Sequence, residues 1–113
     1  MHELGIVSQV LKSVWEVARN YPDRKVRSVY LKVGMLRAIE PEVMRLCWDA
    51  ASKETFAGGA ELVLDLVPTT GGCRRCGMVF GAEDLFFICP ACGVTDVETL
   101  RGKELILERV KMD

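Results

Sequence analysis

Histidine is nearly absent from this chain, because His2 is the only one among its 113 residues. Neither sign of charge predominates, since the chain has 15 Lys and Arg and 16 Asp and Glu. This balance gives the chain no excess of positive charge of the kind that favours binding to nucleic acid. No apolar run is long enough to span a membrane, and the first residues lack the basic and apolar regions of an export signal. We therefore expect a protein of the cytoplasm.

Patterns that carry catalysis are missing as well. The sequence shows no pairing of a nucleophile with a base. It also has no glycine-rich loop of the kind that cradles phosphate groups. We therefore expect this chain to act by docking to other molecules and not as an enzyme.

Four of the five cysteines form two Cys-x-x-Cys pairs. Cys73 and Cys76 are followed, after twelve residues, by Cys89 and Cys92. This spacing can place four thiolates around one tetrahedral metal ion. Such a sulfur set selects zinc or iron, and zinc is the metal we expect. Because four sulfurs leave no position for water, the zinc should be structural.

Other states of these cysteines stay open from sequence alone. They could form two disulfides, remain free thiols, or hold iron as in a rubredoxin-like electron carrier. Gly77 and Gly93 follow the two pairs, and glycine can adopt the positive φ that a metal knuckle often needs. The fifth cysteine, Cys47, is expected to be a small buried residue of a helix.

Hydrophobic periodicity predicts two helices and three strands. The helices are expected over residues 4–20 and 41–56, and the strands over residues 25–35, 61–67 and 105–110. The apolar stripe of the first helix is expected to contain Leu4, Val7, Val10, Leu11, Val14, Val17, Ala18 and Tyr21. Trp15 and Trp48 could each belong to the core or to a partner surface.

The cysteine stretch is inserted between the second and third predicted strands. We expect a boundary at residues 68–72, a short strand and small core at residues 85–88, and a polar segment from Cys92 to Gly102. The predicted fold class is α+β, with two helices on a three-stranded sheet and an inserted four-cysteine zinc module. The predicted domains are an α+β domain, residues 1–67 and 103–113, and a zinc-binding module, residues 68–102.

The first three residues form a possible chelating site. The amine of Met1, the amide nitrogen of His2 and the Nδ1 of its ring can close adjoining chelate rings on one metal. Glu3 adds another backbone nitrogen and a carboxylate. A square-planar set of nitrogen and oxygen ligands suits Ni(II) or Cu(II). The chemistry alone leaves open the alternative that His2 is an ordinary frayed residue.

Four motifs together resemble the HypA/HybF nickel metallochaperones, in the order that the family has them. They are the opening Met1-His2-Glu3-Leu4, the run from Val33-Gly34 to Glu40-Pro41-Glu42, the four-cysteine set and Gly102-Lys103-Glu104-Leu105. The resemblance covers essentially the whole chain and implies a function in [NiFe]-hydrogenase maturation.

Several properties follow from this resemblance as expectations. It implies transferable Ni(II) on Met1, His2 and Glu3, and structural zinc on Cys73, Cys76, Cys89 and Cys92. It implies a HypB-type GTPase as partner and the [NiFe]-hydrogenase large subunit as recipient. Some members also serve urease maturation proteins. The alternative is a zinc-ribbon module that binds proteins without nickel chemistry.

Two departures from the family pattern affect these expectations. Met35 stands where the family's Gly-Glu-Leu pattern has Glu, a position that is not expected to be a ligand. The zinc module also lacks the histidines that some members carry in or near it. The fourth nickel ligand must then be a backbone nitrogen, a carboxylate or water. Glu40 is a candidate, although an acid at a helix N-terminus is an equally good explanation of that residue.

Overall fold

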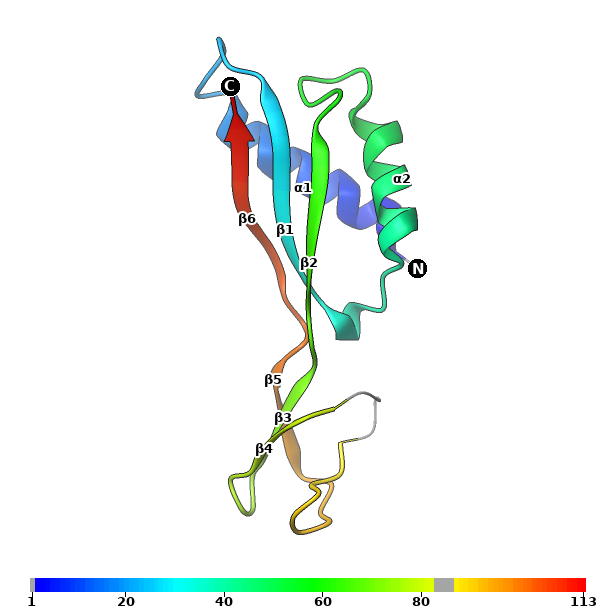
Figure 1. Cartoon of the computed structure of the whole chain (residues 1–113), viewed down its shortest axis with the longest axis vertical. Helices are drawn as coiled ribbons and strands as arrows, with labels where there is room; N and C mark the ends of the chain where they lie inside the picture. The colour runs from blue at the N-terminus through cyan, green and yellow to red at the C-terminus, as the bar shows by residue number, and fades with distance from the viewer. Residues whose placement is uncertain (1, 83–86) are drawn as a thin grey trace. The chain divides into compact units, whose positions relative to one another are not determined.

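A computed structural model of the chain describes residues 2–82 and 87–113 (Figure 1). The chain divides into two compact units. The first, which we call the helical unit, comprises Met1–Lys32, Ile39–Asp65 and Ile106–Asp113. The second, the cysteine unit, comprises Val33–Ala38 and Leu66–Leu105. None of the helices in the described ranges is long and apolar enough to cross a membrane.

The expected helices and strands of the α+β body are present. They are α1 (Glu3–Ala18), β1 (Val26–Gly34), α2 (Pro41–Ser52), β2 (Glu61–Val67) and β6 (Leu105–Met112), with a short 3-10 helix, η1 (Met35–Arg37), after β1. The three strands form one sheet in the order β2-β1-β6. Helix α2 ends four residues before the predicted end. The backbone N–H and the hydroxyl of Thr55 both donate to the carbonyl of Ser52, which closes a turn there.

Both α1 and α2 contribute side chains to the core of the helical unit. The residues of α1 that are buried are Glu3, Ile6, Val7, Val10, Val14 and Ala18, and those of α2 are Met44, Trp48 and Ser52. The indole Nε1 of Trp48, which is fully buried, donates to the carbonyl of Ala60 at 2.9 Å. The predicted stripe of α1 was wrong at Leu4, Val17 and Tyr21, which are exposed. The buried face is centred on Val7, Val10 and Val14, so Leu4 and Val17 flank it and turn outward, whereas Tyr21 lies beyond the end of α1 at Ala18.

The cysteine unit contains a second antiparallel sheet that sequence reasoning missed. Its strands are β3 (Thr70–Cys73), β4 (Val79–Gly81) and β5 (Val97–Arg101), in the order β4-β3-β5. The expected boundary at residues 68–72 thus holds most of β3, and the expected polar segment contains β5. Phe87 and Ile88 lie outside any strand, and the rest of the predicted strand at 85–88 lies outside the described residues. The α+β class is confirmed, with two sheets where the prediction had one.

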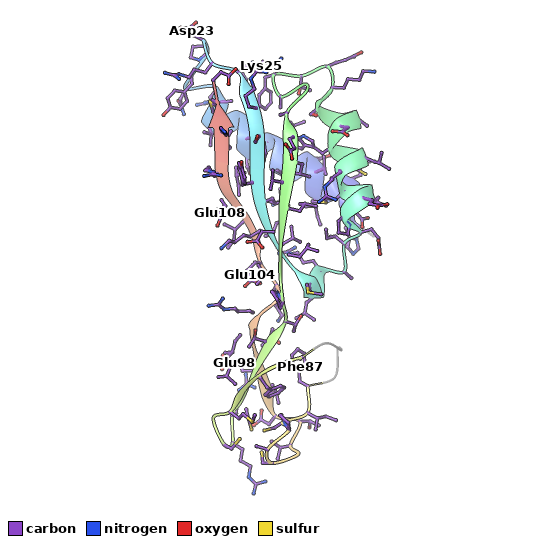
Figure 2. The ribbon with its side chains drawn as sticks, in the orientation of Figure 1. Asp23, Lys25, Phe87, Glu98, Glu104 and Glu108 are labelled. Atoms are coloured by element: carbon purple, nitrogen blue, oxygen red, sulfur yellow. The ribbon has the colours of Figure 1, made fainter. Side chains whose placement is uncertain are left out.

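Gly71 lies at the centre of the small core of this unit. A Cβ placed on Gly71 would lie 2.8 Å from Val97 Cγ1, 3.1 Å from Phe87 Cδ1 and 3.2 Å from Phe80 Cζ. Figure 2 labels Phe87 and shows its ring against the strands of the unit. The apolar side chains therefore cover β3 only because residue 71 has no side chain of its own.

Candidate metal centres

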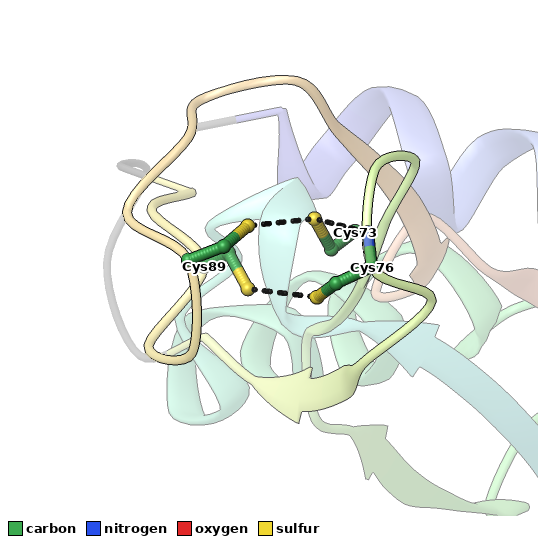
Figure 3. Close-up of side chains that lie close together, drawn as sticks. Cys73, Cys76 and Cys89 are labelled. Atoms are coloured by element: carbon green, nitrogen blue, oxygen red, sulfur yellow. Dashed lines mark hydrogen bonds between the residues drawn. The ribbon is translucent and has the colours of Figure 1, made fainter.

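The structure brings the four paired cysteines together. The Sγ atoms of Cys73, Cys76, Cys89 and Cys92 all lie within 4.8 Å of one another. Figure 3 labels Cys73, Cys76 and Cys89. Contacts of 3.5 Å between Sγ atoms join the two pairs, one between Cys73 and Cys92 and one between Cys76 and Cys89. These separations are far longer than the roughly 2.05 Å of a disulfide, and all five cysteines are free. Cys47 lies on α2, partly buried and outside this group.

Each Cys-x-x-Cys-Gly segment folds into a knuckle with the same hydrogen bonds. In the first, the N–H of Gly77 donates to the carbonyl of Cys73 at 2.9 Å, and the N–H of Cys73 donates to Met78. In the second, the N–H of Gly93 donates to Cys89 at 2.8 Å. The φ angles are 79° at Gly77 and 74° at Gly93, as the sequence predicted. Glycine is required here because L side chains rarely adopt this conformation.

The geometry of the sulfurs fits a tetrahedral metal ion. A zinc–sulfur bond of about 2.3 Å places tetrahedral sulfurs about 3.8 Å apart, close to the observed separations. The first cysteine of each knuckle also favours the thiolate form that a metal requires. The backbone N–H of Cys76 donates to Cys73 Sγ at 3.4 Å and, as the main cause, lowers the pKa of Cys73 to about 6. The backbone N–H of Cys92 lowers the pKa of Cys89 in the same way.

A second group of predicted ligands lies at the N-terminus. Met1 is outside the described residues. His2 is exposed and directly precedes α1, and its carbonyl accepts the first hydrogen bond of the helix, from Ile6 at 2.9 Å. Glu3 lies in the first turn and is only 7% exposed.

The side chain of Glu3 has a structural partner on another element. Its Oε2 accepts a hydrogen bond from the backbone N–H of Glu40 at 2.9 Å. Glu40 is the N-cap residue of α2 and is itself exposed. The structure thus brings together Glu3 and the weaker candidate Glu40. Sequence reasoning named both as possible ligands and missed the bond between them, for which no local pattern gives a signal.

The comparison with known families decides to which family this chain belongs. The whole chain except its last residue, residues 1–112, matches the HypA family, described as "Hydrogenase/urease nickel incorporation, metallochaperone, hypA". The chain belongs to the HypA family. The resemblance drawn from the four sequence motifs is therefore confirmed.

Individual HypA relatives are similar in sequence to this chain over its full length. The chain is 34% identical over 113 residues to "Hydrogenase maturation factor HypA" of Methylocella silvestris, with 100% of both chains covered. The same identity and coverage hold for the HypA of Geobacter sulfurreducens. Solved structures also share the fold. One, "Solution structure of HypA protein", has a TM-score of 0.72 at 23% identity, covering 99% of this chain and 96% of that one.

Another solved structure is "Solution structure of the Ni metallochaperone HypA from Helicobacter pylori". It has a TM-score of 0.68 at 22% identity, and covers 99% of this chain and 97% of that one. Membership of HypA thus places the chain among the nickel-incorporation metallochaperones, as the motifs implied. The HypA relatives are named as maturation factors and metallochaperones. The four-cysteine group is consistent with the structural zinc expected in such a protein.

Proposed function

We propose that the chain binds Ni(II) at Met1, His2 and Glu3 and hands it on during [NiFe]-hydrogenase maturation. The observation that carries this proposal is the match to a nickel-incorporation family over residues 1–112. The only histidine of the chain, His2, stands at the exposed start of α1, where an incoming metal ion can reach it.

The chemistry of the N-terminus supports this role. The first amides of a helix have no carbonyl partner within the helix, so binding a metal there breaks no bond of the helical ladder. The proposed ligands are the Met1 amine, the His2 amide and ring, and the Glu3 backbone nitrogen. Because the Glu3 carboxylate already accepts the N–H of Glu40, we assign that carboxylate to holding the site in place. Glu40 remains a candidate for an additional carboxylate ligand.

The remaining parts of the proposal concern the second metal and the partners. We propose structural zinc on Cys73, Cys76, Cys89 and Cys92, within a module of residues 68–102. Residues 1–67 and 103–113 would form the nickel-binding domain. The chain would act without catalysis, in the cytoplasm, with a HypB-type GTPase and the [NiFe]-hydrogenase large subunit as partners and with urease maturation proteins as further ones.

Two changes at the N-terminus test the nickel site. His2→Ala removes the ring nitrogen and should abolish tight nickel binding in a calorimetric titration, while zinc content and circular dichroism stay unchanged. A single residue added before Met1 keeps His2 but converts the amine into an amide, and it should weaken binding. N-terminal sequencing must accompany His2→Ala, because a small second residue can expose Met1 to removal.

The outcomes separate the individual ligands. If the added residue has no effect while His2→Ala still destroys binding, the Met1 amine is not a ligand. If neither change affects nickel affinity, the proposed site is wrong. Nucleotide hydrolysis by the pure chain would contradict the non-catalytic role.

A further inference from the structure

A groove in the helical unit runs along α1, beside the end of α2 and the segment that follows it. It has two parts, with cavity volumes of about 710 Å³ and about 200 Å³. Trp15 and Phe56 line both parts, so the two parts lie next to each other at this aromatic pair. The groove follows α1 from Ser8 to Ala18, about 15 Å at a rise of 1.5 Å per residue.

The aromatic pair, of which Trp15 is exposed and Phe56 is partly buried, forms an apolar anchor point. The rings of Trp15 and Phe56 lie 5.0 Å apart between centroids, at an angle of 54°. Trp15 is 46% exposed, whereas Trp48 is fully buried in the core. Leu11 and Ala51 extend the apolar lining on the two sides of the groove. Exposed aromatic side chains in a concave apolar surface are the common anchors of protein interfaces.

The charges that line the groove have one sign. The ionisable lining residues with a charge at neutral pH are Lys12, Arg19 and Arg24, and no carboxylate among the described residues lines either part. This contrasts with the net charge of −1 of the whole chain. Within the described residues, Lys12 and Arg24 take part in no ion pair, and Arg19 has only a long one to Glu16, at 3.9 Å. Such an exposed pair is weak, so the cations are available to a partner.

We propose that this groove binds an acidic amphipathic helix of a partner protein. The apolar side of that helix would lie on Trp15 and Phe56, and its carboxylates would face Lys12, Arg19 and Arg24. A groove about 15 Å long accommodates roughly three helical turns. A second copy of this chain that presented its own groove fits less well, because two equally basic grooves would repel each other. The inference uses none of the proposed metal ligands.

A designed peptide serves as the probe. It has about 15 residues, with Leu and Phe at helical spacing and Glu at the other positions, and its control carries Lys in place of every Glu. Binding to the zinc-containing, nickel-free protein is followed by anisotropy of a dye on the peptide and by tryptophan emission, to which the exposed Trp15 and the buried Trp48 both contribute. We expect the Glu peptide to bind about tenfold more tightly than the Lys peptide, with the difference lost at high salt.

Matched variants locate the binding site. Lys12→Glu combined with Arg24→Glu should reverse the preference, so that the Lys peptide binds more tightly. Arg45→Glu reverses one charge at an exposed residue of α2 that does not line the groove, and it should leave the preference unchanged. Circular dichroism checks that each variant is folded, and the reversal itself requires folded protein.

Three results would overturn the proposal. One is equal binding of the two peptides, and another is a loss in Arg45→Glu as large as in the double variant. The third is a dimer, seen by light scattering, that the double variant abolishes, since the groove would then hold a second copy. Because nickel is absent from every assay, these results are independent of the proposed nickel site.

Discussion

The carboxylate of Glu3 accepts the backbone N–H of Glu40 at 2.9 Å and so joins the first turn of α1 to the N-cap of α2. Neither end has a side-chain cap of its own, since neither His2 nor Glu40 makes a capping hydrogen bond with its side chain. The bond therefore replaces a local cap with a link between two elements. It also holds Glu3, which directly follows His2, in a buried position.

We expect Glu3→Ala to lower the melting temperature by about 5 °C, as for the loss of a helix cap in a domain of this size. Glu3→Gln keeps an oxygen that can accept the Glu40 N–H and should retain most of that stability. Nickel affinity should fall more in the Ala variant than in the Gln variant, because the backbone nitrogen of residue 3 becomes less fixed. Differential scanning calorimetry and nickel titration measure both effects. Equal stability of wild type and Glu3→Ala would show that the link is unimportant.

Gly34→Ala should destabilise the cysteine unit by about 3 kcal/mol, the upper end of overpacking effects. The reason is that a Cβ on Gly34 would overlap the carbonyl group of Gly102 and crowd the nitrogen of Lys103. The backbone cannot easily move apart there. The N–H of Gly34 donates to Glu104 at 2.8 Å, and the N–H of Leu36 donates to Gly102 at 2.8 Å.

Gly5→Ala is the matched control for this substitution. Gly5 lies in α1, and a Cβ there would meet nothing within 4 Å. Because Ala is a better helix former, the change should stabilise the protein by about 0.5–1 kcal/mol. Urea unfolding followed by circular dichroism tests both variants. A Gly34→Ala protein as stable as Gly5→Ala would contradict the close approach of residues 34 and 102.

Cys89→Ser should release zinc and disorder the knuckles, because metal binding holds such small modules together by on the order of 10 kcal/mol. Hydrogen exchange should then rise at residues 73–82 and 87–92, while α1 and α2 keep their protection. Cys47→Ser changes a cysteine outside the four-sulfur group and should keep its zinc. Zinc analysis by mass spectrometry accompanies the exchange measurement. Ordered, protease-resistant knuckles in metal-free Cys89→Ser would refute a stabilising role for the metal.

Zinc affinity should fall with decreasing pH, and more steeply below about pH 6. The N–H of Cys76 lowers the pKa of Cys73 to about 6, so in the folded chain this thiol is already ionised at pH 7. The lowered pKa of Cys73 also stabilises the folded chain relative to the unfolded one. This contribution is fully present above the ordinary pKa of a thiol and is lost as the pH falls through about 6. Below that pH the metal must also displace the Cys73 proton. Competition with a chromophoric chelator between pH 5 and 8 measures the trend, and a pH-independent affinity would contradict it.

The sequence by itself determined the local features of this protein. The knuckles follow from Cys-x-x-Cys-Gly, because the cysteine spacing and the positive φ of Gly77 and Gly93 are properties of a few adjacent residues. Helix and strand positions follow from the period of apolar residues, and β2 begins and ends at the predicted residues. The motifs that place the chain in its family are likewise short and can be read along the chain.

Only the tertiary structure decided which elements meet. The second sheet was missed because β3 contains Gly71 and Gly72 and β5 contains Glu98 and Arg101, which gives neither strand a clear apolar alternation. Trp15 and Trp48 could not be told apart in the sequence, and packing buried one and left the other in a groove. The bond from Glu40 to Glu3 spans 37 positions. Contacts of that kind depend on how helices pack, and no short pattern of residues encodes them.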